Sequence, residues 1–175
     1  MDEISNSIVT SSVGEPTSTA ILGPFYRNDT PPTPNDSSII RTDPGNAEFV
    51  FMHGIVSDAT TGKPIAGAKI DIWQCSTNGL YEQQDPDQAE WNLRGKFTSS
   101  EEGYYGTYCI RPVPYPIPYD GKYSLSLSQT MSRLIRPTNK SLGPAGALLK
   151  VLDRHPWRPA HIHLFVCHFM IPVSS

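Results

Sequence analysis

Two histidines separated by one residue, His161 and His163, lie in the run Arg-Pro-Ala-His-Ile-His-Leu-Phe-Val that begins at Arg158. The residues after the proline are apolar enough to predict a strand, and residues i and i+2 of a strand face the same side. Imidazole binds iron, copper, nickel and zinc, so two imidazoles on one face could share a metal ion. The alternative is a strand that carries two unrelated histidines, one of them hydrogen-bonded in the core.

Two tyrosines are the other residues whose setting suggests chemistry. Tyr81 follows a strand-like segment, in Asn-Gly-Leu-Tyr-Glu, and Tyr115 lies in a run of alternate prolines over 111–121. Alternate prolines exclude a helix and a central strand, so we expect a stiff, extended loop that could aim Tyr115 at a fixed point. The alternative is that Tyr115 and Tyr119 are ordinary packed aromatic residues.

Taken together, these motifs resemble the intradiol ring-cleavage dioxygenases, in the branch that contains catechol and hydroxyquinol 1,2-dioxygenases. The resemblance runs from about Ile21 to Val166. It rests on Gly-Leu-Tyr at 79–81, Tyr-Pro-Ile-Pro-x-Asp-Gly at 115–121, His-Pro-x-Arg-Pro-Ala-His-x-His at 155–163, Trp-Asn-Leu-Arg-Gly at 91–95 and Gly-Pro-Phe at 23–25.

The resemblance implies one mononuclear non-haem ferric ion, Fe(3+), per chain, with Tyr81, Tyr115, His161 and His163 as its ligands. Tyrosinate is a hard anionic donor that suits a trivalent ion, and binding to a cation stabilises a phenolate whose parent phenol has a pKa of about 10. A set of two histidines and one carboxylate is instead typical of ferrous oxygenases. The resemblance also implies that Tyr115 leaves the ion when substrate binds and takes up a substrate proton.

Further residues take their roles from the same resemblance. Arg158 matches the family arginine beside the iron, where a fixed cation would contact substrate and stabilise developing negative charge. Its alternative role is a salt bridge near the start of a strand. Leu22, Gly23 and Pro24 match a segment of the substrate-pocket wall, and their alternative role is core packing.

The implied activity is cleavage of a catechol-type ring between its two hydroxylated carbons by O2. The product would be a cis,cis-muconate, or maleylacetate if the substrate is hydroxyquinol, and the sequence leaves the aromatic diol or triol open. The family assembles as a homodimer through an N-terminal helical region. Only polar residues 1–20 stand in that place here, so the dimer is in doubt for this chain.

Composition and charge exclude several other function classes. A net charge of −3 with mixed signs indicates neither a nucleic-acid-binding tract nor a membrane-surface patch. The three cysteines, Cys75, Cys109 and Cys167, are far apart and odd in number, which argues against a disulfide framework or a zinc ribbon. No secretory signal and no stretch of transmembrane length is visible, so a cytoplasmic location is expected.

Short apolar runs between 17 prolines and 13 glycines favour an all-β chain with many turns. Strands are predicted over 49–56, 68–74 and 104–110, one or two helical turns over 148–153, and a last strand that carries both histidines. In the second strand, alternation places the apolar side chains on one face and Lys69 and Asp71 on the other. The predicted fold class is a β-sandwich of short, mostly antiparallel strands with long loops, incomplete at the C-terminus.

Two regions are predicted along the chain. Residues 1–47 form a lead-in and connector where the family has its helical region, and 48–175 form the dioxygenase sandwich. Residues 122–143 interrupt the family pattern and 167–175 form a tail outside it. We interpret 122–143 as a retained intron, because codons resembling splice sites can encode its ends; a genuine surface insertion is the alternative. Missing closing strands would expose edges and apolar faces.

Two other functions remain open on the sequence alone. The first is a non-catalytic β-sandwich module with a vestigial metal site or none, because strand–turn–strand patterns of this kind also occur in such modules. The second is a zinc or copper site that uses the same histidine pair, although it would leave Tyr81 and Tyr115 unexplained.

Overall fold

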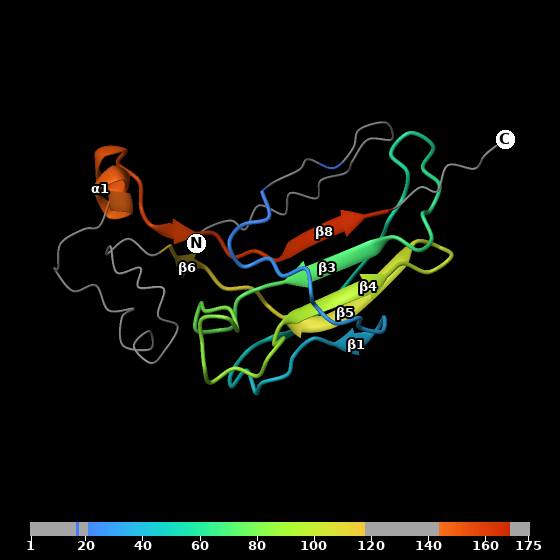
Figure 1. Ribbon diagram of the computed structural model, residues 1–175, viewed down its shortest axis with the longest axis horizontal. Coiled ribbons are helices and arrows are strands. Elements are labelled where there is room, and N and C mark those ends of the chain that lie inside the picture. Colours follow the sequence, from blue (N-terminus) through green and yellow to red (C-terminus); the bar gives the residue numbers. More distant parts are fainter. Residues whose placement is uncertain (1–16, 18–20, 118–143, 169–175) are drawn as a thin grey trace.

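The protein, seen in a computed structural model that describes residue 17 and residues 21–117 and 144–168, is built mainly from short strands. They form two three-stranded sheets and a separate two-stranded pair (Figure 1). In chain order the elements are β1 (Ser37–Ser38), β2 (Phe49–Ile55), β3 (Lys69–Trp73), β4 (Arg94–Thr98), β5 (Tyr104–Ile110), β6 (Tyr115–Pro116), α1 (Pro144–Val151), β7 (Trp157–Arg158) and β8 (His163–Cys167).

The two larger sheets make the sandwich that the sequence predicts. One has the order β1-β5-β2, with β2 antiparallel to β5 and β1 parallel to it. The other has the order β4-β3-β8, with both neighbours antiparallel to β3. Side chains from both sheets meet in a buried core that consists of Ile39, Ile70, Ile72, Phe97 and Cys109. The prediction of a β-sandwich of short, mostly antiparallel strands is therefore confirmed.

Three strands form close to where hydrophobic alternation places them. β2 and β5 match 49–56 and 104–110 to within one residue, and β3 lies inside 68–74. The helical turns predicted over 148–153 belong to α1, which begins earlier, at Pro144. The sequence does not predict β4, because Arg-Gly-Lys-Phe-Thr contains a single large apolar residue; it forms a strand because it pairs with β3 along its whole length.

The polar face of β3 differs from the prediction. Ile70 and Ile72 are buried as expected, and Lys69 is exposed, but Asp71 is only 4% exposed. The ring of Tyr26 covers this face, since it packs against Trp73 with centroids 5.3 Å apart. Burial raises the pKa of the Asp71 carboxyl above its ordinary value. Alternation thus identified the two faces correctly but not the segment that covers the second one.

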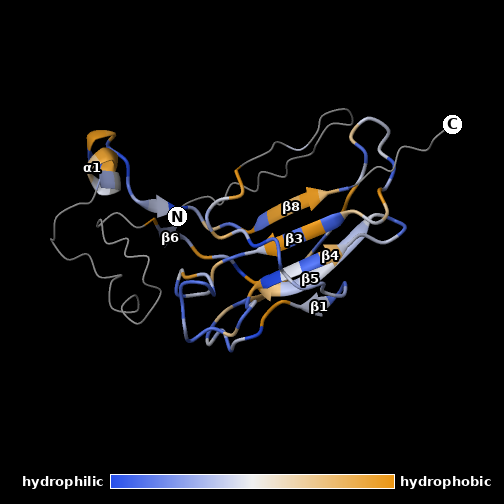
Figure 2. Cartoon of the chain, in the orientation of Figure 1, coloured by the Kyte–Doolittle hydropathy of each residue, from blue (hydrophilic) through white to orange (hydrophobic). Residues whose placement is uncertain are grey.

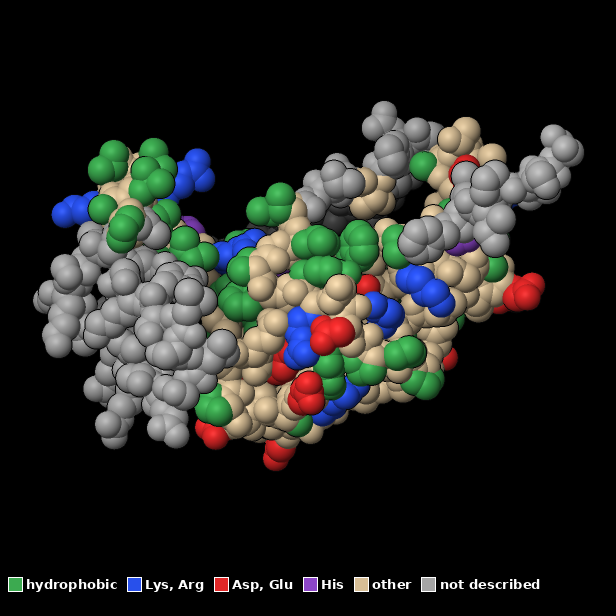
Figure 3. All heavy atoms as spheres, viewed as in Figure 1, with side chains coloured by type: hydrophobic (Ala, Val, Ile, Leu, Met, Phe, Trp, Pro, Cys, Tyr) green, Lys and Arg blue, Asp and Glu red, His purple; other side chains and the backbone are tan. Residues whose placement is uncertain are grey.

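Apolar side chains also remain on the outside. Leu164 and Val166 of β8 are 42% and 44% exposed, and β8 has only β3 as a partner among the described residues. In Figure 2, β8 is mainly hydrophobic, whereas β3 alternates between hydrophobic and hydrophilic residues. Leu148 and Val151 of α1 are also exposed. Figure 3 shows hydrophobic side chains gathered on the surface over this helix, at the other end of the molecule.

Several predictions concern residues outside the described ranges. They include the segment 122–143, most of the lead-in over 1–20, and 169–175 of the tail. The first residue of that tail, Cys167, is described and is the last residue of β8, where it pairs with Lys69. No helix among the described residues is long and apolar enough to cross a membrane.

The cysteines lead to a prediction about thiol reactivity. Burial raises the pKa values of Cys75 and Cys109 to about 11, so at about pH 8 only on the order of one thiol in a thousand is ionised at either site. Cys167 is partly exposed. We expect a disulfide reagent to label one thiol of the native chain at that pH, and all three in denaturant. Rapid labelling of three thiols in the native chain would contradict the burial.

Candidate metal centre

A tight turn after β3 places Tyr81. The Ser76 N–H donates to the Leu80 carbonyl over 2.8 Å, and the Gly79 N–H donates to the Ser76 carbonyl over 2.9 Å. Gly79 has φ +79°, and a Cβ there would lie 3.0 Å from the Tyr115 Cβ, so glycine satisfies both the turn and the close approach. Tyr81 is fully buried, and Phe25 stacks on its ring at 4.3 Å.

The proline-rich segment brings Tyr115 to the same place. The sequence predicts a stiff loop here, and in the structure this segment contains the two-residue strand β6, which pairs with β7. This small ladder agrees with the rule that proline is tolerated where its missing N–H faces no partner. Tyr115 is 5% exposed, and its Cα partner in the ladder is Arg158.

The prediction that one strand carries both histidines is wrong for His161. β8 begins at His163, and His161 precedes it in the short connection from β7. His163 is opposite Trp73 in the sheet, and the two rings are parallel at 4.7 Å. The His161 Nδ1 lies 2.6 Å from the Pro159 carbonyl. With Nδ1–H as the donor of that hydrogen bond, Nε2 is left free to act as a ligand.

The four predicted ligands come together despite this correction. The Tyr81 Oη lies 3.1 Å from the Tyr115 Oη, the Tyr115 Oη lies 3.4 Å from the His161 Nε2, and the His161 Nε2 lies 3.1 Å from the His163 Nε2. Donor atoms bound at about 2 Å to a single ion are separated by roughly 3 Å. The spacing of these oxygens and nitrogens therefore fits one metal ion.

The electrostatic setting fits a cation with strong charge. Burial, followed by the hydrogen bond to Tyr115, raises the pKa of Tyr81 far above its ordinary value, so its phenolate needs a nearby positive ion. Burial, with a smaller contribution from His161, lowers the pKa of His163 to about 4, which keeps the imidazole neutral and able to bind a metal. Among the described residues, no group of three or more His, Cys, Asp or Glu side chains could hold a metal ion. A four-donor site at this place would therefore include the two phenols.

Of the residues predicted to contact substrate, only Arg158 has a described contact with one of the four donor residues. The guanidinium of Arg158 is 5.9 Å from the centre of the Tyr115 ring, beside the four donors. Leu22, Gly23 and Pro24 are exposed, which excludes core packing. The next residue, Phe25, is the one that reaches Tyr81.

Some residues of the site were missed from the sequence. Trp73 supports His163, Phe25 supports Tyr81, and the guanidinium of Arg94 lies over the Tyr81 ring at 5.9 Å. Phe25 and Arg94 belong to motifs that matched the family, so the signal for them was present. Trp73 lies inside the predicted strand over 68–74 and had no such signal.

Comparison with known proteins decides the family. A family model described as "Dioxygenase" matches residues 21–141. The chain belongs to the intradiol ring-cleavage dioxygenases. It is 45% identical over 96% of its length to an intradiol ring-cleavage dioxygenase of Aspergillus niger, and 46% identical over 87% to a catechol 1,2-dioxygenase of Candida albicans.

A solved structure agrees with this family. The hydroxyquinol 1,2-dioxygenase of Pseudomonas putida superposes with a TM-score of 0.69 at 34% identity, over 87% of this chain and 44% of that one. The chain likewise spans 46% and 43% of the two curated relatives, less than half of their length. These relatives are dioxygenases, so the alternative of a non-catalytic β-sandwich module is not favoured.

Proposed function

We propose that this intradiol dioxygenase cleaves a catechol-type ring between its two hydroxylated carbons with O2. The product is a cis,cis-muconate from a catechol, or maleylacetate from hydroxyquinol. The observation that carries the proposal is the convergence of two buried phenols with two imidazoles, at spacings of 3.1–3.4 Å. The names of relatives that act on catechol and hydroxyquinol support it.

Tyr81, Tyr115, His161 and His163 would hold one ferric ion. When bound, the ion supplies Lewis acidity and an electron-accepting centre that makes the aromatic diol reactive toward O2. Two phenolates offset much of its charge, and hard oxygen donors favour the trivalent state over the ferrous one. The parallel packing of Trp73 on His163 and of Phe25 on Tyr81 holds two of these donors in fixed orientations.

Tyr115 is the donor placed to exchange with substrate. Its Oη lies 3.1 Å from the Tyr81 Oη and 3.4 Å from the His161 Nε2. As a phenolate it can accept a proton from a substrate hydroxyl at Oη. Tyr81 is the more enclosed of the two phenols and remains the anchored ligand.

Arg158 and the segment 22–24 complete the proposed substrate site. Arg158 is exposed and its guanidinium lies over the Tyr115 ring, so it can approach a substrate that displaces that phenol. A fixed cation there stabilises negative charge that develops on the ring oxygens. We assign Leu22, Gly23 and Pro24 to the pocket wall, since Phe25 connects them to Tyr81.

The test uses the purified full chain, loaded anaerobically with ferrous iron and then oxidised in air. We expect a visible tyrosinate-to-iron charge-transfer band, and O2 uptake with the product's absorbance when catechol or hydroxyquinol is added. Tyr81→Phe and Tyr115→Phe should each weaken the band. Tyr108→Phe is the matched control, because Tyr108 lies exposed on β5. A chain that stays colourless after loading, or a band that survives both ligand changes, would refute the proposed site.

A further inference from the structure

A buried ion pair lies directly beside Tyr81. The Arg94 Nε donates to the Glu82 Oε2 over 2.6 Å, and the two side chains are 1% and 3% exposed. The Arg94 Nη2 also donates to the Gln83 side-chain oxygen over 2.9 Å. Removing two charges from water costs several kilocalories per ion even after relaxation. A pair this deeply buried adjacent to a site is therefore a candidate for a functional role.

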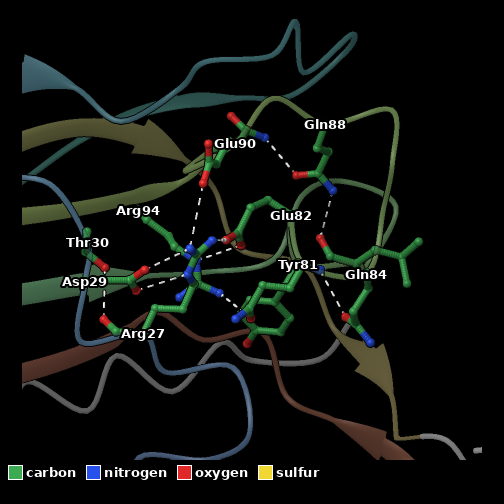
Figure 4. Close-up of polar contacts among 12 residues, drawn as sticks. Arg27, Asp29, Thr30, Tyr81, Glu82, Gln84, Gln88, Glu90 and Arg94 are labelled. Atoms are coloured by element: carbon green, nitrogen blue, oxygen red, sulfur yellow. Dashed lines mark hydrogen bonds and ion pairs between the residues drawn. The ribbon is translucent and has the colours of Figure 1, made fainter. Parts of the chain in front are cut away.

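The pair is connected to Tyr81 by both backbone and ring. Glu82 follows Tyr81 in the chain, and the Tyr81 N–H donates to the Gln84 Oε1 over 3.1 Å. The guanidinium of Arg94 lies over the Tyr81 ring, with its carbon 5.9 Å from the ring centre. Figure 4 shows Arg94 and Glu82 gathered beside this ring. The position of the phenol and the charge near it thus depend on the same two residues.

Arg27 occupies the other oxygen of Glu82. Its Nη1 donates to the Glu82 Oε1 over 3.1 Å, and its guanidinium lies 3.5 Å from the centre of the Trp91 ring. Arg27 also reaches outward to Asp29, whose side chain is 61% exposed. If Arg94 is replaced, Glu82 still has Arg27 as a cationic partner. If Glu82 is replaced, Arg94 has no other carboxylate partner among the described residues.

The backbone before Arg94 is held in a costly conformation. Trp91 and Leu93 have φ angles of 64° and 57°, which bulky residues rarely adopt. Asn92 between them accepts hydrogen bonds from the backbone N–H groups of Arg41 and Thr42. This strained turn delivers Arg94 to the first position of β4, opposite Trp73, the residue that supports His163.

The two phenols differ in the cation beside them. Arg94 and Arg158 each lie 5.9 Å from a tyrosine ring centre, Arg94 over Tyr81 and Arg158 over Tyr115. Arg94 is buried and held in an ion pair, whereas Arg158 is exposed. Solvent and salt screen a buried charge much less than an exposed one. The Arg94 charge near Tyr81 is therefore screened less than the Arg158 charge near Tyr115.

We propose that Glu82 and Arg94 are positioning residues for Tyr81, and that they set how strongly its phenolate donates to a bound ferric ion. This inference rests on the proposed function. The Arg94 cation lowers the energy of the phenolate electrons, and the Glu82 anion opposes that effect. Changing one residue at a time should therefore move the tyrosinate charge-transfer band in opposite directions, which a purely structural role would not do.

The experiment compares single variants of the full chain after iron loading. In Arg94→Met the band should move to longer wavelength, because the phenolate becomes a stronger donor. In Glu82→Gln it should move to shorter wavelength, because the cation is no longer offset. Arg94→Lys should stay near the parent band.

Arg111→Met is the matched control, because it removes the same charge from an exposed pair with Glu48, and its band should not move. If Arg94→Met does not fold, Glu82→Gln still gives the decisive sign, since glutamine keeps an acceptor for the Arg94 Nε. Bands that stay in place, or that shift the same way in Arg94→Met and Glu82→Gln, would overturn this inference alone. A parent chain without the band would remove the metal site, and this inference with it.

Discussion

Replacing His163 with alanine is expected to abolish iron binding and ring cleavage together. The change removes one of four donors, and it also removes the ring that packs parallel to Trp73 at 4.7 Å. Loss of an outer-shell partner costs about 10- to 100-fold in metal affinity, so loss of a direct ligand should exceed the upper end of that range. Iron content after loading and gel filtration, with O2 uptake on catechol, measures both effects.

His155→Ala is the matched control for this prediction. His155 lies in the same segment of the chain and is exposed, so the same substitution should leave iron content and band unchanged. Full iron content in both His163→Ala and His155→Ala would show that the histidine of β8 is not a ligand. A loss of iron in both variants would contradict a specific role for His163 and indicate general disruption of the segment over 155–163.

Replacing Glu82 with alanine is expected to lower the free energy of unfolding more than any other substitution proposed for this chain. The change leaves Arg94, only 1% exposed, without a carboxylate partner. Breaking a buried ion pair from one side costs about 3–5 kcal/mol, because the remaining charge is buried and uncompensated. Urea unfolding of the metal-free full chain, followed by the fluorescence of its tryptophans, measures the change in the free energy of unfolding.

Glu48→Ala provides the comparison for that measurement. Glu48 pairs with Arg111 at 2.9 Å, but the two side chains are 64% and 59% exposed. An exposed pair contributes about 0–1 kcal/mol, so the same substitution should have little effect there. If the two glutamate variants lost similar amounts of stability, the Glu82–Arg94 pair would contribute no more to the free energy of unfolding than an exposed ion pair does.

Local pattern accounts for the strands that were predicted correctly. Apolar alternation and turn residues mark β2, β3 and β5, because period-two burial and turn chemistry are written in neighbouring residues. β4 contains a single large apolar residue, Phe97, which is a weak local signal for a strand, and β4 forms by pairing with β3. His161 lies before β8 and not in it, since pairing with β3 begins at His163.

The residue types of the site were predictable, and its supports were not. Two phenols and two imidazoles suit a trivalent ion, and their motifs resemble those of the intradiol dioxygenases. That Arg94 is fully buried could not be predicted, because arginine is almost always exposed unless it is paired. Its partner, Glu82, is twelve residues away in sequence and reaches it only through the turn after β3.

The sequence by itself determined the β-sandwich, the family and the four residues offered to a metal, because alternation, turn residues and short motifs are local properties of the chain. Only the tertiary structure decided that those four side chains meet at 3.1–3.4 Å. It also decided that Trp73, Phe25 and Arg94 support them. The physical reason is that packing and burial depend on strand pairing between residues far apart in sequence, which no local pattern specifies.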